Sequence, residues 1–399
     1  MKCLTALVAL ASAALAQTDS VIWQSRPRPS LAVHRTAGCC AGTYFYLMGG
    51  FSDGGAGTDQ VFRYDNNLGV WTPRARMPFP TSNHCAVYFQ PENRVYVFGG
   101  ELEIPYDYVQ IYDVGRDSWS YRFMPHADYG MSAAVLDDSI YVAFGAEHPG
   151  LFFRYHPNTD DWAPRARSPD SAHNGAMCSL DGKIYYAGGW DSLKVFRRYD
   201  PGNNVWTRLP DLPQGRHGLG LIALAGHIYM VGGGQRWNTG ADCRDVYVFD
   251  PDSNCWHYDS RTHDLHIAGA YGTYTYSPNA YLFAVCGYST NACEVGHRLV
   301  AGIGSGSSDH LRPRALNTYP NPFRMQTTIS LQPGISTSRE LRIYSAAGRM
   351  VNSFLFPGLP GSSFPPLVWS GCDSTGFSLP AGTYILTYGR ERLTVCRLD

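Results

Sequence analysis

The sequence of 399 residues has few charged side chains and no excess of either sign. Asp, Glu, Lys and Arg make up 16% of the chain, and 32 basic residues stand against 33 acidic ones. A chain without a net positive field does not attract nucleic acid or acidic lipid. We therefore expect no nucleic-acid partner.

Long hydrophobic runs are also scarce. Beyond the N-terminus no stretch approaches the roughly 18 apolar residues that cross a bilayer, so no transmembrane segment is expected. The N-terminus itself has Lys2, an apolar run over residues 3–15 and Ala14-Leu15-Ala16 before Gln17. This pattern predicts a signal peptide over residues 1–16 and a secreted protein. The alternative, a buried first helix, is disfavoured because the run is short and a polar segment follows.

Metal and nucleotide motifs are absent from the sequence. There is no CxxC pair, no zinc-type His/Cys spacing, no Ser/His/Asp order and no phosphate-binding loop, so no metal or cofactor is expected. Beyond the signal peptide stand ten cysteines: Cys39, Cys40, Cys85, Cys178, Cys243, Cys255, Cys286, Cys293, Cys372 and Cys396. An even number in an oxidising compartment permits disulfides, and Cys286 with Cys293, and Cys372 with Cys396, are the pairs we expect to come within range.

The sequence is rich in glycine, tyrosine and tryptophan, with 42, 27 and 9 residues. Its apolar residues show no recurring helical period. This composition predicts an all-β chain. A repeat of 40 to 50 residues is visible, and each copy has a β-rich run that ends in a pair of mostly small residues: Gly49-Gly50, Gly99-Gly100, Gly145-Ala146, Gly188-Gly189, Gly232-Gly233 and Cys286-Gly287.

The first five copies continue with the same two signals. An aromatic residue is followed by an acidic residue or histidine: Tyr64-Asp65, Tyr112-Asp113, Tyr155-His156, Tyr199-Asp200 and Phe249-Asp250. A tryptophan then follows within six or seven residues: Trp71, Trp119, Trp162, Trp206 and Trp256. We interpret the repeated glycines and tryptophans as architecture, because glycine permits special backbone geometry and tryptophan fills gaps between packed sheets.

The pattern resembles the Kelch repeat over about residues 20–301. The resemblance implies a six-bladed Kelch-type β-propeller of four-stranded blades over residues 17–301. The sixth copy lacks its own tryptophan, whereas Trp23 precedes the first glycine pair. We therefore expect residues 21–25 to complete blade six beside the strand near residues 298–300 and so close the ring, which removes exposed strand edges.

A different module follows a Gly/Ser-rich linker over residues 302–315. Residues 316–399 contain Tyr319-Pro320-Asn321-Pro322-Phe323, Leu341 to Arg349, Trp369-Ser370-Gly371-Cys372-Asp373 and Leu379 to Tyr384. These motifs resemble the C-terminal sorting domain of bacterial type IX secretion and the immunoglobulin-like domain of flagellar hook-capping proteins. The resemblance implies a small β-sandwich that is read by the export machinery and leaves the protein extracellular or at the bacterial outer-membrane surface. An accessory sandwich without a sorting role remains the alternative, since the chain ends in Cys396-Arg397-Leu398-Asp399 rather than a basic, β-branched strand.

Candidate site residues come from registering the repeats on their first glycine. Counting back 15 residues gives His34, His84, His173 and His217 in four copies, with Tyr129 beside the corresponding position in the third. By the Kelch topology this position lies at the start of the innermost strand, on the face of the loops that follow the glycine pairs. We expect the channel mouth to combine these residues with loop residues, as a hypothetical ligand site: Glu101, Glu147, Trp190, Asp191, Arg236 and Trp237. The alternative is that the histidines only bond neighbouring blades.

Three functions are compatible with the resemblance. The first is a binding protein whose propeller face recognises a glycan or a protein partner. The second is an enzyme acting on sugars, similar to the periplasmic sialic-acid mutarotases, with Glu101, Glu103, Glu147 or Asp191 as acid or base. A copper radical oxidase is least favoured, because no motif places its metal ligands. We lean toward the non-enzymatic binding protein.

Overall fold

The computed structural model describes residues 20–52, 54–170, 173–235, 243–276, 279–288, 290–299, 316–319, 327–331, 340–345, 349–355, 367–375, 377–388 and 391–397. The predicted signal peptide and linker therefore lie outside the described residues. The chain divides into two compact units, Met1–Ala301 and Gly302–Asp399. The architecture is all-β, as predicted, and its helical content in the described residues is a short 3-10 turn, η1 (Gln90–Glu92).

The first unit contains six four-stranded antiparallel sheets within the described residues. Five are consecutive along the chain: β3 (Ala37–Ala41), β4 (Tyr44–Met48), β6 (Val61–Asp65), β7 (Val70–Arg74); β8 (Cys85–Phe89), β9 (Arg94–Phe98), β10 (Tyr106–Asp113), β11 (Ser118–Asp128); β12 (Ser132–Leu136), β13 (Ser139–Ala143), β14 (Phe152–His156), β15 (Asp161–Pro164); β16 (Ala176–Leu180), β17 (Lys183–Ala187), β18 (Phe196–Asp200), β19 (Val205–Arg208); and β20 (His217–Leu224), β21 (His227–Gly234), β22 (Asp245–Asp250), β23 (Cys255–Arg261). A short pair, β2 (Val33–His34) with β5 (Phe51–Ser52), lies beside them.

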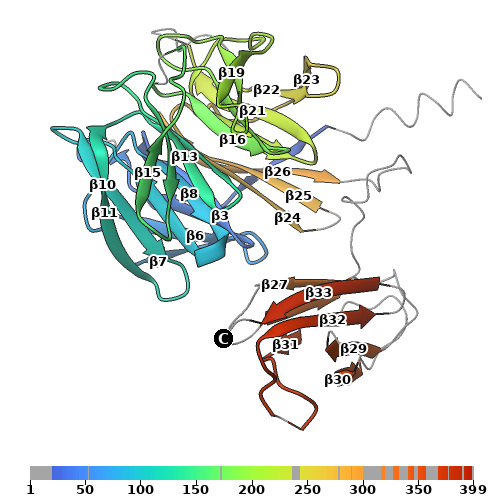
Figure 1. Cartoon of the computed structure of the whole chain (residues 1–399). Coiled ribbons are helices and arrows are strands. Elements are labelled where there is room, and N and C mark those ends of the chain that lie inside the picture. Colours follow the sequence, from blue (N-terminus) through green and yellow to red (C-terminus); the bar gives the residue numbers. More distant parts are fainter. Residues whose placement is uncertain are drawn as a thin grey trace, which may run out of the picture. The chain divides into compact units, whose positions relative to one another are not determined.

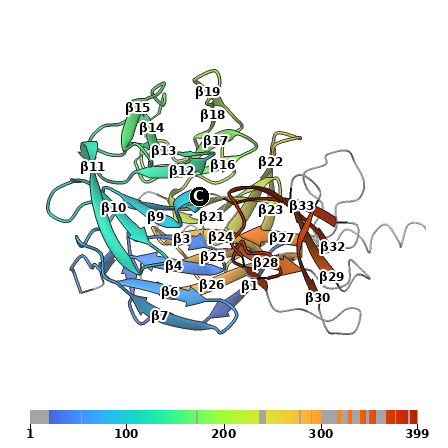
Figure 2. The ribbon, with the colours of Figure 1, turned by 60° about the horizontal axis from the view of Figure 1, so that its bottom comes forward.

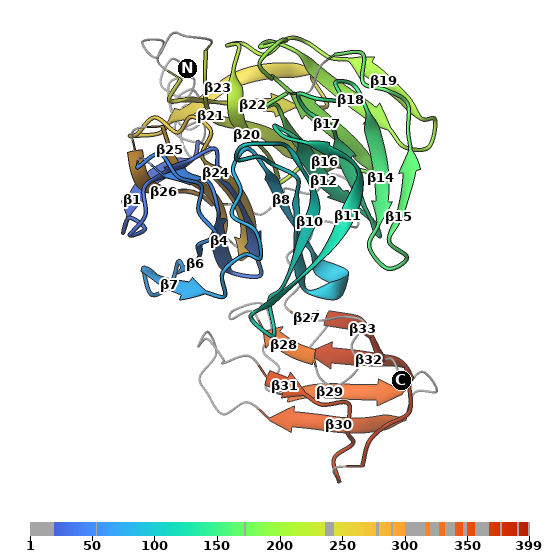
Figure 3. The same cartoon turned by 90° about the vertical axis from the view of Figure 1, so that its left-hand side faces the viewer.

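The six sheets are the blades of a propeller (Figure 1). Their first strands contact one another in cyclic order, from β3 through β8, β12, β16 and β20 to β24 (Ala270–Tyr276) and back to β3. Figure 3 shows inner strands such as β12 and β16 toward the middle, with β15 and β19 at the periphery. The inner strands therefore surround one central channel.

The sixth sheet combines both ends of this unit. It has the order β1 (Ile22–Arg26), β26 (Thr290–Leu299), β25 (Asn279–Gly287), β24, and Figure 2 shows β1 beside β26. The register pairs Trp23 with Gly296, so β1 lies beside residues 293–297 of β26, the strand that ends at Leu299. The Trp23 indole is buried against Gly296, whose missing side chain leaves room for it.

The repeated acidic residue and tryptophan each have a local role. Asp65 Oδ1 accepts hydrogen bonds from the backbone N–H groups of Asn67 and Leu68 at 2.9 and 3.1 Å, which is the Asx geometry that tightens a turn. The tryptophan indoles donate to backbone carbonyls of the preceding interblade connections in four copies: Trp71 to Pro27, Trp119 to Ala75, Trp206 to Ala166 and Trp256 to Pro210. These tryptophans tie one blade to the next, consistent with their interpretation as architecture.

The cysteines of the propeller are thiols in the described structure, so the expected Cys286–Cys293 disulfide is not formed. Cys286 Sγ instead lies 3.8 Å from the carbonyl oxygen of Leu31, and Cys293 is paired across the sheet with Val285. Cys39 and Cys40 belong to different apolar clusters on the two faces of β3, as strand alternation requires. Cys372 is also a thiol, and the side chain of Cys396 lies outside the described residues.

The second unit has two sheets that share one apolar core. One contains β27 (Leu316–Tyr319), β28 (Thr327–Leu331) and β31 (Leu367–Trp369); the other contains β29 (Glu340–Ser345), β30 (Met350–Leu355), β32 (Gly382–Tyr388) and β33 (Glu391–Arg397). Trp369 and Ile329 from the first sheet are buried with Leu341, Ile343 and Leu386 from the second. Among the described residues, no helix is long and apolar enough to cross a membrane.

Candidate functional site

At or just before the start of each inner strand, one residue adopts a left-handed backbone conformation. The six residues have φ between 51° and 66°: Arg35, Asn83, Gly130, Asn174, Gly218 and Ala268. The backbone N–H of each donates to the carbonyl oxygen of the one before it, at 2.7 to 2.9 Å over the five links from Arg35 to Ala268. We call these six residues the throat ring. It joins the blades and forms the opening of the channel.

The residues directly before the throat ring occupy equivalent places at the channel mouth. They are His34, Ser82, Tyr129, His173, His217 and Ile267. Each is joined by backbone pairing to the residue that follows the second glycine of its blade: Phe51, Glu101, Ala146, Trp190, Gly234 and Tyr288. The second glycine is required in this geometry, because a Cβ on Gly145 would lie 1.9 Å from the carbonyl oxygen of Tyr129. The mouth therefore carries two side-chain positions per blade.

Aromatic rings occupy one side of this mouth. Tyr129 and His173 have ring centroids 5.5 Å apart, and Trp190 lies 6.4 Å from His173 and 4.5 Å from His217. Toward the closing blade, His34 stacks on Tyr288 at 4.0 Å. The structure thus places Tyr129, His173, Trp190 and His217 in one series of neighbouring rings, and His34 against Tyr288.

A charged and amide-rich group occupies the mouth beside these rings. Arg35 Nε donates to the Tyr288 hydroxyl at 2.6 Å, and Arg35 Nη1 lies 4.0 Å from Glu101 Oε1. Asn83 Nδ2 donates to the same Glu101 oxygen at 2.7 Å. The predicted Glu101 is therefore held between a guanidinium and an amide.

The protonation states at the mouth follow from burial and these charges. Burial lowers the pKa of His173, although the nearby carboxylates of Asp191, Asp128 and Glu101 act in the opposite direction. The His173 imidazole is therefore neutral at neutral pH, with one nitrogen that donates and one that accepts. Burial also raises the pKa of Tyr129, and the charges of Glu101 and Glu147 add to that effect. These couplings place Asp191 and Glu147 within electrostatic reach of the mouth.

His84 is a correction to the predicted site. Four residues connect β8 to β9, whereas two connect β3 to β4, so counting back 15 residues from Gly99 stops two residues short of the equivalent position, which is Ser82. His84 follows the throat ring instead of preceding it. Its side chain is buried between blades, where Nε2 donates to the carbonyl oxygen of Met48 at 3.0 Å. The alternative reading, a histidine that bonds a neighbouring blade, is right for this residue.

The small-residue pair of the third copy is Phe144-Gly145 and not Gly145-Ala146 as predicted. The first residue of the pair in the fourth copy, Gly188, donates its backbone N–H to the carbonyl oxygen of Val195, and Phe144 makes the equivalent bond to Leu151. Phe144 therefore occupies the first position of the pair and Gly145 the second. The predicted Arg236 and Trp237 lie outside the described residues.

Four site residues were missed from sequence: Arg35, Asn83, Asn174 and Tyr288. The first three belong to the throat ring, and the available signal was a polar residue immediately before an inner strand. Asparagine is frequent in the left-handed conformation because its short side chain bonds locally. Tyr288 could have been found because it follows Gly287 as Trp190 follows Gly189.

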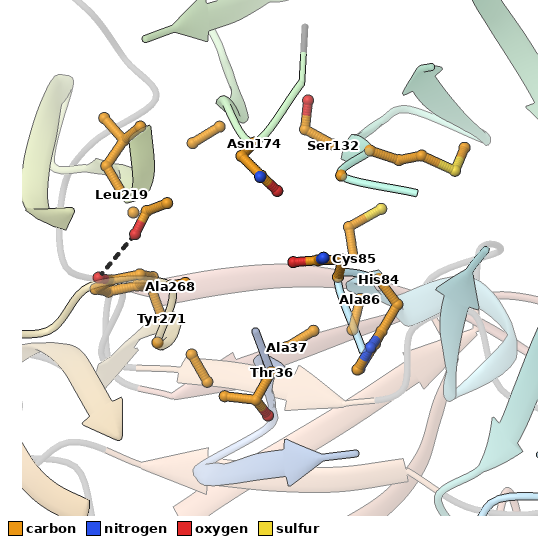
Figure 4. A pocket seen from close by; sticks show the side chains of 18 of the residues that line it. Thr36, Ala37, His84, Cys85, Ala86, Ser132, Asn174, Leu219, Ala268 and Tyr271 are labelled. Carbon is orange, nitrogen blue, oxygen red and sulfur yellow. Dashed lines mark hydrogen bonds between the residues drawn. The ribbon is translucent and has the colours of Figure 1, made fainter. Parts of the chain in front are cut away.

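Below the throat ring the channel contains a cavity of about 170 Å³. Its wall consists largely of glycine and alanine with a few polar groups, and Figure 4 shows the Asn174 amide pointing into it. The described residues contain no group of three or more His, Cys, Asp or Glu side chains that could hold a metal ion.

Four fully buried polar side chains fix the mouth loops from beneath. They share one position, two residues before the throat ring: Thr81, Asp128, Arg216 and His266. Asp128 accepts from the backbone N–H groups of Gly145, Glu147 and His148 at 3.0 to 3.1 Å. Arg216 donates to the carbonyl oxygens of Gly232 and Asp245 at 2.7 and 2.8 Å. Buried groups with several bonds hold a loop in one conformation.

The Kelch motif family matches residues 171–213 and 215–260. Kelch-like protein 35 of Mus musculus is 32% identical over 127 residues, which are 31% of this chain and 21% of that protein, so the chain spans about a fifth of this relative. The solved structure of YjhT matches with a TM-score of 0.55 and 14% identity, over 68% of this chain and 95% of YjhT. At that identity the likeness shows the fold alone. The motif matches and the sheets around one channel together identify the first unit as a Kelch-repeat β-propeller.

Proposed function

We propose that the propeller mouth binds a glycan and that the protein is a secreted or cell-surface binding protein. The observation that supports this most directly is the presence of aromatic rings and a polar, charged group at one opening. The His34–Tyr288 stack contacts Arg35 of the Arg35, Glu101 and Asn83 group, and Trp190 lies at the same opening against His173 and His217.

The two halves of the mouth complement the two chemistries of a sugar ring. Aromatic faces pack against the C–H surface of a pyranose, and carboxylate, amide and guanidinium groups bond its hydroxyls. Neutral His173 adds one donor and one acceptor. Because backbone bonds hold the mouth residues in place and buried Asp128 fixes the loop that contains Glu147, little ordering entropy is lost on binding. A protein partner at the same face is the remaining binding alternative.

A sugar-active enzyme similar to the mutarotases is the second candidate. It needs a proton donor and an acceptor at the ligand, and Glu101 with neutral His173 supplies such a pair within electrostatic range. Glu103 is exposed and not among the residues that shape the mouth described above, whereas Glu147 and Asp191 act electrostatically on Tyr129 and His173. Detecting turnover separates the two candidates.

Replacing Arg35 by alanine in the full chain should weaken glycan affinity at least tenfold. The variant removes the donor that faces Glu101 and Tyr288, and a lost charge-assisted bond costs roughly 1.5 to 3 kcal/mol. A glycan-array screen selects the ligand, and calorimetry measures its affinity for the wild type and variant. Arg116→Ala is the matched control, because this arginine is exposed in a turn between β10 and β11.

An unchanged affinity in Arg35→Ala would remove the mouth from consideration. Conversion of the bound sugar to its isomer, followed by NMR, would replace the binding protein by the isomerase. Capture of a protein but no sugar would select the protein-binding alternative.

We also propose that residues 316–399 direct export, by the type IX route that their motifs resemble. Deleting residues 302–399 should abolish appearance of the propeller at the surface or in the medium of a bacterium that has this route. Fractionation with an antibody against the propeller measures it, and N-terminal sequencing of the exported full chain should start at Gln17. Export of the truncated chain would leave the module as an accessory sandwich.

A further inference from the structure

A buried histidine and a buried glutamate join the last interblade connection to the sheet that closes the propeller. His266 lies in the connection between β23 and β24, and Glu294 lies on β26, where it is paired with Ser25 of β1. Both side chains are 0% exposed, and we call them the closing pair. Buried ionisable groups need complete hydrogen bonds, so the bonds of the closing pair show which protons it carries.

The Glu294 carboxylate is surrounded by donors. Its Oε1 accepts from the backbone N–H of His263 at 2.8 Å, and its Oε2 accepts from that of Asp264 at 2.9 Å. Burial raises the pKa of Glu294, but hydrogen bonds from His266, Asp264 and His263 outweigh burial and hold the pKa below its usual range. Glu294 is therefore ionised at neutral pH, and both of its oxygens are acceptors.

Both ring nitrogens of His266 face acceptors. Nε2 lies 2.9 Å from Glu294 Oε2, and Nδ1 lies 2.8 Å from the backbone carbonyl oxygen of Cys286. A neutral imidazole has one N–H and one bare nitrogen, so it can donate only one of these two bonds. The bare nitrogen would then face an oxygen lone pair at hydrogen-bond distance. Only the imidazolium, with an N–H on each nitrogen, satisfies both contacts.

Other titratable and charged groups surround the closing pair. They are Tyr271 of β24, Cys286 of β25, Cys293 of β26, Arg216 at the equivalent place one blade earlier, and His263, Asp264 and Arg244 in or beside the same connection. Burial raises the pKa of Tyr271 and of Cys293, so both are uncharged at neutral pH. The imidazole of His263 lies 2.7 Å from Glu294 Oε1 but is 59% exposed, so water screens its charge.

We propose that the closing pair is a pH-dependent switch: protonated His266 holds the sixth sheet together, and loss of one ring proton to solvent base releases either Glu294 or the Cys286 carbonyl. Glu294 lies beside the N-terminal strand, and Cys286 lies two residues before Tyr288 of the mouth. A buried acceptor that loses its donor costs free energy, so alkaline pH loosens the sheet that joins both ends of the propeller. This property does not depend on glycan binding and goes beyond the function proposed above.

The direction of the pH dependence follows from proton uptake. A histidine in the unfolded chain loses its proton at about pH 6.5. Above that pH the folded chain keeps a proton that the unfolded chain has lost, so stability falls as the pH rises.

Urea unfolding of the full chain at pH 7 and pH 8 tests the proposal. The unfolding equilibrium constant of the wild type should rise by about fivefold or more relative to that of His266→Gln, because one extra bound proton changes the equilibrium by up to about tenfold per pH unit. His263→Gln and His257→Gln are the matched controls, since both positions are exposed, and both variants should keep most of the wild-type pH dependence. Groups common to these proteins, such as the buried thiols, cancel in the comparison.

NMR of the wild-type chain with nitrogen-labelled histidine gives a second measurement that needs no variant to fold. It should show one histidine with both ring nitrogens protonated at pH 8. A spectrum in which every histidine is neutral at pH 8 would overturn the proposal, as would equal pH dependence of unfolding in the wild type and His266→Gln. Loss of the pH dependence in His263→Gln but not in His266→Gln would assign the effect to the exposed histidine instead.

Discussion

Trp23→Ala should lower the free energy of unfolding by about 3 to 5 kcal/mol, the range for truncating a buried aromatic side chain. Trp23 is 6% exposed, packs beside Gly296 and donates from Nε1 to Ser260 Oγ at 3.1 Å. It belongs to the strand through which the N-terminal segment completes the sixth sheet, so its loss loosens the closure of the ring. Equilibrium unfolding in urea measures the effect.

Ile22→Ala is the control for this experiment. Ile22 is the neighbouring residue of the same strand, has a backbone partner of its own in His297, and is 63% exposed. Its loss should cost well under 1 kcal/mol, as surface substitutions usually do. Deleting residues 20–26 should be more damaging than Trp23→Ala, because it also exposes the edge of β26. An equal and small effect of both point variants would mean that the ring does not depend on this strand.

Acid should destabilise the propeller through His84. Burial lowers the pKa of this imidazole from 6.5 to about 4 in the folded chain, although its bond to the Met48 carbonyl acts the other way. As the pH falls, the unfolded chain takes up the proton first, so the stabilising difference is complete above about pH 6.5 and is lost progressively down to pH 4. This pKa shift corresponds to a loss of about 3 kcal/mol in the free energy of unfolding between pH 6.5 and pH 4.

The comparison is between wild type and His84→Asn, unfolded in urea at pH 7.5 and pH 4.5. The wild type should lose about 2 to 3 kcal/mol more than the variant between these values. The measurements stay at pH 4.5 or above to limit the contribution of Glu294. Burial raises the pKa of this carboxyl, but hydrogen bonds from His266, Asp264 and His263 outweigh burial and hold the pKa below 4.5. The stability that Glu294 contributes is therefore lost at lower pH. His257→Asn, at an exposed position, should behave as the wild type. Parallel pH profiles for wild type and His84→Asn would disprove this role.

The sequence was sufficient for the blades because their signals act over a few residues. Asp65 turns its own hairpin, and Trp71 reaches a neighbouring connection from a fixed place in the strand, so each repeat carries its instructions locally. The strand that starts with Ile22 could also be assigned to the sixth blade, because it has a tryptophan and the sixth copy lacks one. The residues of β26 that pair with this strand could not be assigned from the sequence, because the register depends on packing along the whole edge of β26.

The site was predictable only where the repeats have equal length. Counting from the glycines placed His34, His173 and His217 at the mouth, but failed for His84 because the hairpin containing η1 is two residues longer. Arg35 was overlooked because a left-handed arginine has no special sequence signature. Its importance arises from bonds to Glu101 and Tyr288, which lie far away in sequence.

The buried polar residues beneath the mouth have a consequence for how this propeller can be modified. Thr81, Asp128, Arg216 and His266 occupy one position yet use a hydroxyl, a carboxylate, a guanidinium and an imidazole to bind the backbone of the blade that follows them. A loop and its anchor are therefore a matched pair. A graft that moves the segment containing Glu147 to another blade must carry an aspartate with it, because a recipient arginine or histidine would present donors to N–H groups that need an acceptor.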